Sequence, residues 1–409
     1  MMVVEQEFIQ EANEGDSLSM DRDLNIQLRS ATWPRGTSPP ASMVTGMQSF
    51  HIPSVLLLIG QLTTPPHRAG ISLSEYWAYV RYLNALTGRN ILELTKEYAD
   101  LDSHQKTILS DDFGMGFAMD YLTRTLDLTP PVDGRYFVKN MLGATGATYS
   151  GGGKVGPGKT PDFVALDRSG KWHVVECKGT QSDSRYQTKQ LDAGRVQKQT
   201  IDFPSSVRGE RIVASLQVGS EQSKFDSVLV IEDPEPEDPV HVKSDELPRA
   251  ADAVHRGALA VALQLAGFPA SSSLISAPDG DEPGAETLSG QAESNRLQSV
   301  RRKRELSTRE FQAAADRIAD GGYIGRAVEF ELPGLRELSD GRIAKAKITN
   351  GISKDLIERM QVARTYDFRQ SLADQIGVAG DELDLRREGS GNSAELAFGK
   401  LYRARIELN

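Results

Sequence analysis

Two acids and a lysine lie on either side of one predicted turn. Asp162 precedes a short apolar run, and Glu176 and Lys178 end a second run that follows the turn at Arg168–Lys171. Folding the two runs back on each other gives a β-hairpin, with Ser169-Gly170 at the tip of the turn. The hairpin brings Asp162, at one open end, next to Glu176 and Lys178 at the other. Side chains alternate along a strand, so Glu176 and Lys178 share a face.

These residue types fit a site that hydrolyses phosphodiesters with a divalent cation. Mg²⁺ prefers oxygen ligands in octahedral geometry. Asp162 and Glu176 supply two carboxylates, and the backbone carbonyl of Cys177 is a third expected ligand. A bound cation polarises a phosphodiester and lowers the pKa of water. Lys178 is expected to position or deprotonate the attacking water, or to offset charge on the pentacovalent state.

An ordinary surface hairpin with a Glu–Lys pair is the alternative interpretation. Three features favour a site. Pro161-Asp162 precedes the pair at hairpin distance, and Val174 and Val175 run directly into the charged residues, which indicates a core boundary. Gly179 ends the strand and lets a substrate backbone approach.

At these residues the chain resembles the PD-(D/E)XK nuclease superfamily, which has the restriction-endonuclease-like fold. The match is Pro161-Asp162 followed by Glu176-Cys177-Lys178-Gly179, and the resemblance covers roughly residues 106–235. It implies a central mixed sheet flanked by helices, phosphodiester hydrolysis, and dependence on Mg²⁺, for which Mn²⁺ can substitute. It also implies that Asp162, Glu176 and Lys178 are the catalytic residues.

A helix after the second strand is expected to carry further site residues. Members of the superfamily often have a polar side chain there that touches the scissile phosphate. The resemblance gives this role to Gln190 and Gln197, near Gln187 and Arg195. A solvated polar helix face is the alternative for all of these residues.

One departure from the superfamily pattern concerns the helix that precedes the sheet. Many members have a metal-binding Glu on this helix, whereas Met115 and Ala118 stand where it is expected here. Asp120 or Asp112 could substitute as an additional metal ligand. The alternative is that Asp112 caps the helix and Asp120 is a surface acid.

Composition excludes several other classes of protein. The chain has 409 residues, with 39% hydrophobic and 25% charged residues and a formal net charge of -10. This charge argues against coating nucleic acid through overall electrostatics, although a local basic groove remains compatible with it. The single cysteine, Cys177, excludes a disulfide framework and a zinc site of several cysteines.

No segment predicts export or a membrane span. The first residues lack a basic start followed by an apolar stretch, so no secretory signal is expected. The longest apolar run, residues 54–60, is far shorter than the ~20 residues of a membrane helix. We therefore expect a cytoplasmic protein that has no membrane partner.

The order of expected elements divides the chain into four parts. Residues 1–105 are expected to be a mostly helical region, 106–267 the α/β nuclease domain, 268–295 a flexible linker, and 296–409 a smaller α+β domain. Expected strands cover residues 135–141, 163–167, 172–178, 211–218, 227–232, 328–332 and 343–348. Expected helices cover 72–105, 113–126, 185–201, 250–266, 307–320 and 354–365.

Two further segments carry phosphate-binding residue types. Residues 153–160 match the P-loop letters, but a P-loop requires a helix at its Lys, and here Pro161 and a strand follow. A Gly-rich loop beside the hairpin is the favoured interpretation, with Lys154 and Lys159 contacting nucleic-acid phosphates. Arg301 and Arg302, in a basic cluster after the linker, are candidate DNA contacts or part of a solvated helix.

These features together favour a Mg²⁺-dependent endodeoxyribonuclease. Such an enzyme would suit bacterial restriction or anti-phage defence. Cutting both strands of a duplex usually needs two sites, so we expect a homo-oligomer. The alternative is a catalytically degenerate nuclease fold that binds nucleic acid or a partner protein, and the missing helix Glu motivates it.

Overall fold

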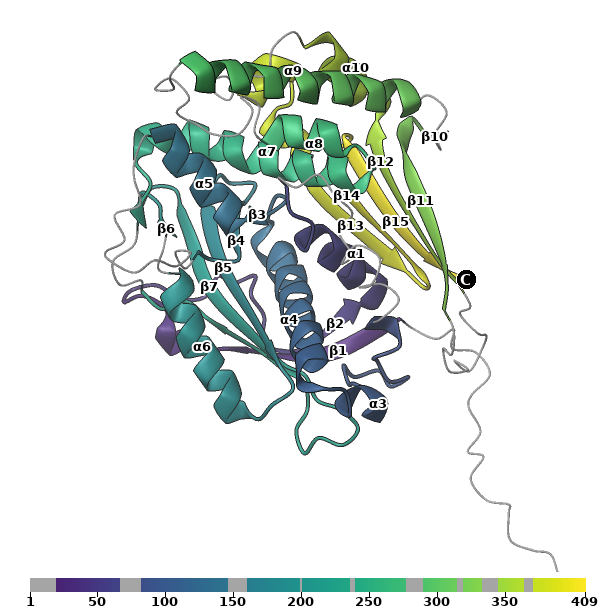
Figure 1. The fold of residues 1–409 in the computed structure, drawn as a ribbon. Coiled ribbons are helices and arrows are strands. Elements are labelled where there is room, and N and C mark those ends of the chain that lie inside the picture. Colours follow the sequence, from purple (N-terminus) through teal and green to yellow (C-terminus); the bar gives the residue numbers. More distant parts are fainter. Residues whose placement is uncertain are drawn as a thin grey trace, which may run out of the picture.

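A computed structural model of the chain describes residues 20–66, 82–145, 160–198, 201–235, 240–276, 290–314, 319–332, 345–363 and 371–409. It shows a mixed α/β architecture with a seven-stranded mixed sheet and a six-stranded antiparallel sheet, flanked by helices (Figure 1). The mixed α/β class expected from the sequence is confirmed.

The seven-stranded sheet carries the hairpin. Its strand order is β2 (Gly46–His51), β1 (Asp21–Leu28), β8 (Val228–Glu232), β7 (Arg208–Gln217), β5 (Trp172–Thr180), β4 (Phe163–Leu166) and β3 (Val132–Asp133). The pairs β5–β7 and β1–β8 are parallel, and the other pairs are antiparallel. The inner strands β5 and β7 are buried along most of their length, which is typical of strands covered on both faces.

Helices cover both faces of this sheet. On one face, Val175 and Cys177 of β5 share a core cluster with Phe113 and Phe117 of α4 (Ser103–Leu126). On the other face, Leu191 of α6 (Ser184–Lys198) packs on β7 and β8. The hairpin therefore lies between two helical layers, so its charged end is partly removed from water.

The six-stranded sheet packs against the first unit through helix α1 (Ile52–Leu62). Its order is β10 (Ala319–Asp320), β11 (Tyr323–Glu331), β12 (Lys345–Ser353), β15 (Tyr402–Leu408), β14 (Ser393–Phe398) and β13 (Leu385–Ser390). Every residue of α1 from Ile52 to Gln61 is buried, as expected of a helix that is apolar all round. One hydrophobic cluster runs from Met20 to Leu408, so the two sheets share a core.

The remaining elements pack around these layers. Helix α8 (Pro269–Ser276) lies against α7 (Leu247–Leu265) and α9 (Gly290–Ala313) (Figure 1). The shorter elements are α3 (Lys96–Ala99), α5 (Gly134–Thr145), α10 (Lys354–Val362), α11 (Leu372–Ile376), β6 (Ile201–Asp202) and β9 (Val240–His241).

Most local predictions match the structure. The strands expected at 163–167, 172–178, 211–218 and 227–232 are β4, β5, β7 and β8. The helices expected at 185–201, 250–266 and 354–365 correspond to α6, α7 and α10, and the strands expected at 328–332 and 343–348 pair as β11 and β12. These predictions are correct because the apolar residues of each segment repeat with the period of a strand or with that of a helix, and not with both.

The strand expected at 135–141 is instead helix α5. The Asp133 carboxylate accepts a hydrogen bond from the Tyr136 N–H at 2.6 Å and so caps the helix. Tyr136 and Phe137 are buried, whereas Arg135 and Lys139 are exposed. The short apolar pattern of residues 135–141 fits both the period of a strand and the period of a helix. The N-cap formed by Asp133 favours the helix.

The described part of residues 1–105, expected to be mostly helical, contains two strands beside its helices α1 and α3. Strands β1 and β2 form there, and β1 joins β8, about two hundred residues later in the chain. Residues 21–26 alternate in burial with a period of two, so Leu24 and Ile26 reach the core. Of the helix expected at 72–105, residues 72–81 lie outside the described residues, and the described remainder is not one continuous helix, since α3 covers only Lys96–Ala99 and α4 starts at Ser103.

The remaining corrections concern the expected linker and the starts of two helices. Helices α8 and α9 occupy both ends of the expected linker 268–295, while residues 277–289 lie outside the described residues. The helix expected to start at Ser307 starts at Gly290. The Glu310 carboxylate of α9 accepts hydrogen bonds from the Ala270 and Ser271 N–H groups at the start of α8. Helix α4 begins after Asp102, whose carboxylate caps it, and not at residue 113.

No helix among the described residues is both long enough and apolar enough to cross a membrane.

We predict that Gly114→Ala destabilises the protein by about 1–3 kcal/mol, the usual cost of overpacking. A Cβ at Gly114 would lie 2.3 Å from the Lys178 backbone oxygen, and neither backbone can easily move. Gly88→Ala is the matched control, because a Cβ there meets nothing within 4 Å. Urea denaturation measures both variants. Equal midpoints would contradict this close approach of α4 to β5.

Candidate functional site

Reciprocal hydrogen bonds close the open end of the β4–β5 hairpin. The Cys177 N–H donates to Asp162 Oδ2 at 2.8 Å, and the Asp162 N–H donates to Glu176 Oε2 at 3.1 Å. Lys178 Nζ donates to the other Glu176 oxygen, Oε1. The structure thus brings together the three residues that the sequence predicts as catalytic.

Burial controls the charge of this cluster. The Glu176 side chain is 0% exposed and that of Lys178 is 20% exposed. Burial, together with the charge of Asp162, raises the pKa of Glu176 to about 8, although Lys178 opposes the shift. Burial also raises the pKa of Asp162. Two poorly solvated acids therefore share one ammonium group, an arrangement that favours a further cation.

Lys178 stays charged in these surroundings. Burial by itself lowers the pKa of Lys178, but the charges of Glu176 and Asp162 outweigh it and raise the pKa above its ordinary value. Lys178 is therefore an ammonium group at neutral pH.

The Cys177 backbone completes the oxygen donors at this edge. In an extended strand, the N–H and C=O of one residue point to the same side. The Cys177 N–H points to Asp162, so its carbonyl lies on that side too. Strand β4 begins at Phe163, opposite Val175, and therefore stops short of Cys177. The Cys177 thiol is buried in the core on the α4 face.

These donors fit a small, hard cation. Among the described residues, no three His, Cys, Asp or Glu side chains form a ready-made metal cluster. Mg²⁺ does not require one, because it keeps several waters and uses one or two carboxylates. The carboxylates of Asp162 and Glu176 meet this requirement, and the Cys177 carbonyl adds a third oxygen ligand. The Lys178 ammonium would have to leave Glu176 Oε1 for a cation to bind there.

Helix α6 covers the cluster from one side. A Cβ at Gly194 would lie 2.7 Å from a Val213 methyl group and 3.3 Å from Glu176 Cγ, so the helix packs directly over both side chains. Gln190 Nε2 donates to the Gly179 oxygen at 2.9 Å. Gln190 thus contacts the site strand, and its expected contact with a scissile phosphate stays a prediction.

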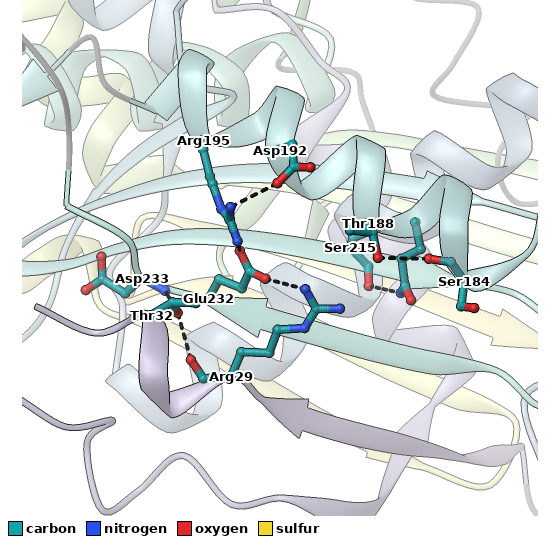
Figure 2. Close-up of polar contacts among 10 residues, drawn as sticks. Arg29, Thr32, Ser184, Thr188, Asp192, Arg195, Ser215, Glu232 and Asp233 are labelled. Carbon is teal, nitrogen blue, oxygen red and sulfur yellow. Dashed lines mark hydrogen bonds and ion pairs between the residues drawn. The ribbon is translucent and has the colours of Figure 1, made fainter.

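An ion-pair cluster fixes α6 on the sheet (Figure 2). Glu232, at the end of β8, has a side chain that is 0% exposed. It accepts hydrogen bonds from Arg29 Nη1 at 2.7 Å and from Arg195 Nε and Nη2 at 2.9 and 2.7 Å. Gln187 Nε2 donates to the Ser215 oxygen at 2.8 Å. Arg195 and Gln187 thus hold the helix in place.

Asp111 of α4 is a site residue that the sequence interpretation missed. Burial raises the pKa of Asp111, whereas the nearby Lys178 ammonium and a hydrogen bond from the Gly179 N–H lower it. Asp111 also adds to the negative charge around Asp162. The sequence does contain a clue to Asp111: it lies one helical turn before Met115, and Met115 is a position at which an acid was expected.

Asp120 and Asp112 are not brought to the cluster. Asp120 is buried, and Arg387 Nη1 and Arg124 Nε bind its carboxylate, the latter at 3.0 Å. It lies about 13 Å along α4 from Asp111 at 1.5 Å per residue. Asp112 accepts a hydrogen bond from the Tyr82 hydroxyl. Neither residue replaces the missing Glu.

Of the other predicted contacts, only Arg301 and Arg302 have described side chains. Lys154, Lys159 and the side chain of Gln197 lie outside the described residues. Arg301 and Arg302 are exposed on α9, which Figure 1 places beyond α7 and α8 at the edge of the molecule.

Comparisons with known proteins found no matching family model, no matching curated protein and no matching solved structure. The geometry and charge of the hairpin cluster therefore carry the argument for function.

We predict that Glu176→Gln removes a pH dependence of stability. The folded protein holds a proton on Glu176 that the unfolded chain releases between the ordinary pKa of 4.5 and about 8. The free energy of unfolding of the wild type should therefore fall as pH rises through this window, by up to about 1.4 kcal/mol for each pH unit. Without divalent cations, the variant should gain stability relative to wild type between pH 5 and pH 8. Parallel denaturation profiles would contradict this.

We predict that Asp111→Asn weakens Mn²⁺ binding several-fold, because it removes a negative charge beside the donor oxygens. Calorimetric titration measures the affinity. Asp100→Asn, an exposed acid in the loop before α4, is the control and should leave the affinity unchanged. Equal affinities for wild type and Asp111→Asn would mean that α4 takes no part in the site.

Proposed function

We propose that this chain is a metal-dependent nuclease that hydrolyses phosphodiester bonds, with DNA as its substrate. One observation carries the proposal. Asp162 and Glu176 are joined by hydrogen bonds at a buried hairpin end, beside a charged Lys178 and a backbone carbonyl. The hairpin, helix α6 and the parallel pair β5–β7 also agree with the restriction-endonuclease-like core that the resemblance implies.

The cation would be held by Asp162, Glu176 and the Cys177 carbonyl, with Asp111 adding negative charge nearby. Mg²⁺ is the expected cation, and Mn²⁺ can substitute. When bound, it supplies Lewis acidity at the phosphate and lowers the pKa of water.

Lys178 has a defined role in this proposal. Its pKa is raised, so it holds its proton at neutral pH. A protonated lysine cannot accept a proton from water. As an ammonium group, Lys178 offsets negative charge on the pentacovalent phosphate, which is one of the roles expected from the sequence.

A second candidate is a binding module without catalysis. The observation that favours it is that both Glu176 oxygens are already bound, one by Lys178 and one by the Asp162 N–H. A cation must displace Lys178, and a site that never releases it would be inactive. Such a chain would still bind nucleic acid or a partner protein.

The proposal extends to assembly and biological setting. Cutting both strands of a duplex needs two sites, and most soluble oligomers are symmetric copies of one chain. We therefore propose a homo-oligomer. Restriction or anti-phage defence is the setting that suits such a nuclease.

We predict that the wild type cleaves plasmid and linear DNA with Mg²⁺ or Mn²⁺, and that Asp162→Ala and Lys178→Ala each lower the rate by at least about a hundredfold, as loss of one charge-stabilising group typically does. Gel electrophoresis with time measures the rates. Lys224→Ala is the matched control, because Lys224 is exposed and distant in sequence from the hairpin.

Three outcomes separate the candidates. Cleavage that survives Lys178→Ala would contradict the proposed site. Tight, salt-dependent binding of DNA without cleavage, with either cation, would favour the binding module. Absence of both cleavage and binding would contradict both candidates.

A further inference from the structure

The register of α6 divides its surface into three stripes. Gln187, Leu191 and Gly194 face the sheet. A second stripe carries Ser184, Thr188 and Arg195, and Figure 2 shows Arg195 reaching Glu232 of β8. The third stripe carries Tyr186, Lys189 and Gln190, which lie three or four residues apart and so share a flank.

Gln190 locates the third stripe beside the candidate site. Its Nε2 donates to the Gly179 oxygen, one residue after Lys178. The strand order β8, β7, β5, β4 places Glu232 and the hairpin on opposite sides of α6. The Arg195 stripe faces β8, so the Tyr186 stripe faces the side of β4 and Asp162.

Tyr186 is exposed at this position without a packing reason. Its side chain is 50% exposed, and it lies one turn, about 6 Å, before Gln190. Side chains lean toward the start of a helix, which here follows directly from the end of β5. Gly194, which packs over Glu176, lies eight residues or about 12 Å further along the helix, so the Tyr186 ring lies beyond the end of β5, on the path of a strand that leaves the site.

The charge of this stripe is positive. Lys189 is exposed and has no ion-pair partner within the described ranges of the chain. The nearest acids are engaged elsewhere, because Asp192 pairs with Arg195 at 2.9 Å and Asp183 accepts the Tyr186 N–H at the start of the helix. An anionic strand that reaches Lys178 can follow this flank without meeting a free carboxylate on it.

We propose that the Tyr186 stripe binds the substrate strand, and that the Tyr186 ring stacks on an unpaired base of the strand whose phosphate reaches Lys178. This inference rests on the proposed nuclease function and names its substrate class, a single strand or a locally unpaired duplex. Bases in a duplex have both faces covered by their neighbours, so an exposed ring gains contact with an unpaired base. Lys189 contacts a neighbouring phosphate as a point charge.

The test is binding of single-stranded and duplex oligonucleotides that carry 2-aminopurine, in EDTA so that no cleavage occurs. Fluorescence anisotropy of an end label gives affinity, and quenching of 2-aminopurine reports stacking. The proteins are the wild type, Tyr186→Ala, Tyr186→Phe and the control Thr188→Ala from the opposite flank. Both substituted positions are exposed, and thermal melting checks folding.

The wild type should prefer the single strand and quench 2-aminopurine at one position. Tyr186→Ala should lose the quenching and bind on the order of tenfold more weakly, the usual loss for one base–aromatic stack. Tyr186→Phe should retain both, and Thr188→Ala should match wild type. Lys189→Ala should reduce the slope of log affinity against log salt by about one.

The inference is overturned if Tyr186→Ala binds and quenches like wild type, or if the wild type prefers duplex without quenching. Either result leaves the nuclease function standing if DNA is still cut with Mg²⁺. Conversely, if the wild type stacks on single strands but never cuts DNA, the nuclease proposal is contradicted and the binding role of the Tyr186 stripe is retained. A wild type that binds no nucleic acid overturns both.

Discussion

The reciprocal hydrogen bonds between Asp162 and residues 176–177 are the constraint on which the rest of the site depends. Backbone pairing between β4 and β5 stops at Phe163 and Val175. Beyond that point, hydrogen bonds from backbone N–H groups to the Asp162 and Glu176 carboxylates hold the end of the hairpin together. This fixes two carboxylates and one carbonyl on the same edge of β5. The surrounding fold then removes that edge from water, with α4 approaching through Gly114 and α6 through Gly194. A larger residue at Gly114 would separate α4 from β5, and a larger residue at Gly194 would separate α6 from the sheet and let water reach Glu176.

Such an arrangement is unfavourable without a cation. Burying a carboxylate costs free energy unless it is paired and hydrogen-bonded, and here two acids share the Lys178 ammonium. The rest of the molecule tolerates this cost because its core is continuous. Helix α1 is buried between α4 and the second sheet, and Glu232 ties α6 to β8 through Arg195. Unfavourable burial of charged groups of this kind is common where proteins bind ions or substrates.

Local sequence patterns were enough to predict the hairpin and its three charged residues, because the turn, the alternation and the charged residues all lie within Thr160–Thr180. They were not enough where a distant partner decides the outcome. Strands β1 and β2 form because β8 accepts them, and Asp120 is unavailable to the site because Arg387, 267 residues away, binds it. Asp111 was missed because the position of an acid along α4 depends on where that helix crosses β5. The domain division remains a prediction, although one core joins both sheets.

The end of the hairpin, in this interpretation, holds a divalent cation. Diffraction from crystals grown with Mn²⁺, recorded where manganese scatters anomalously, tests this most directly. We expect an anomalous peak within coordination distance of the Asp162 and Glu176 carboxylates and the Cys177 carbonyl, with Lys178 moved off Glu176. An ordered hairpin with Lys178 still on Glu176 and no peak at saturating Mn²⁺ would contradict it.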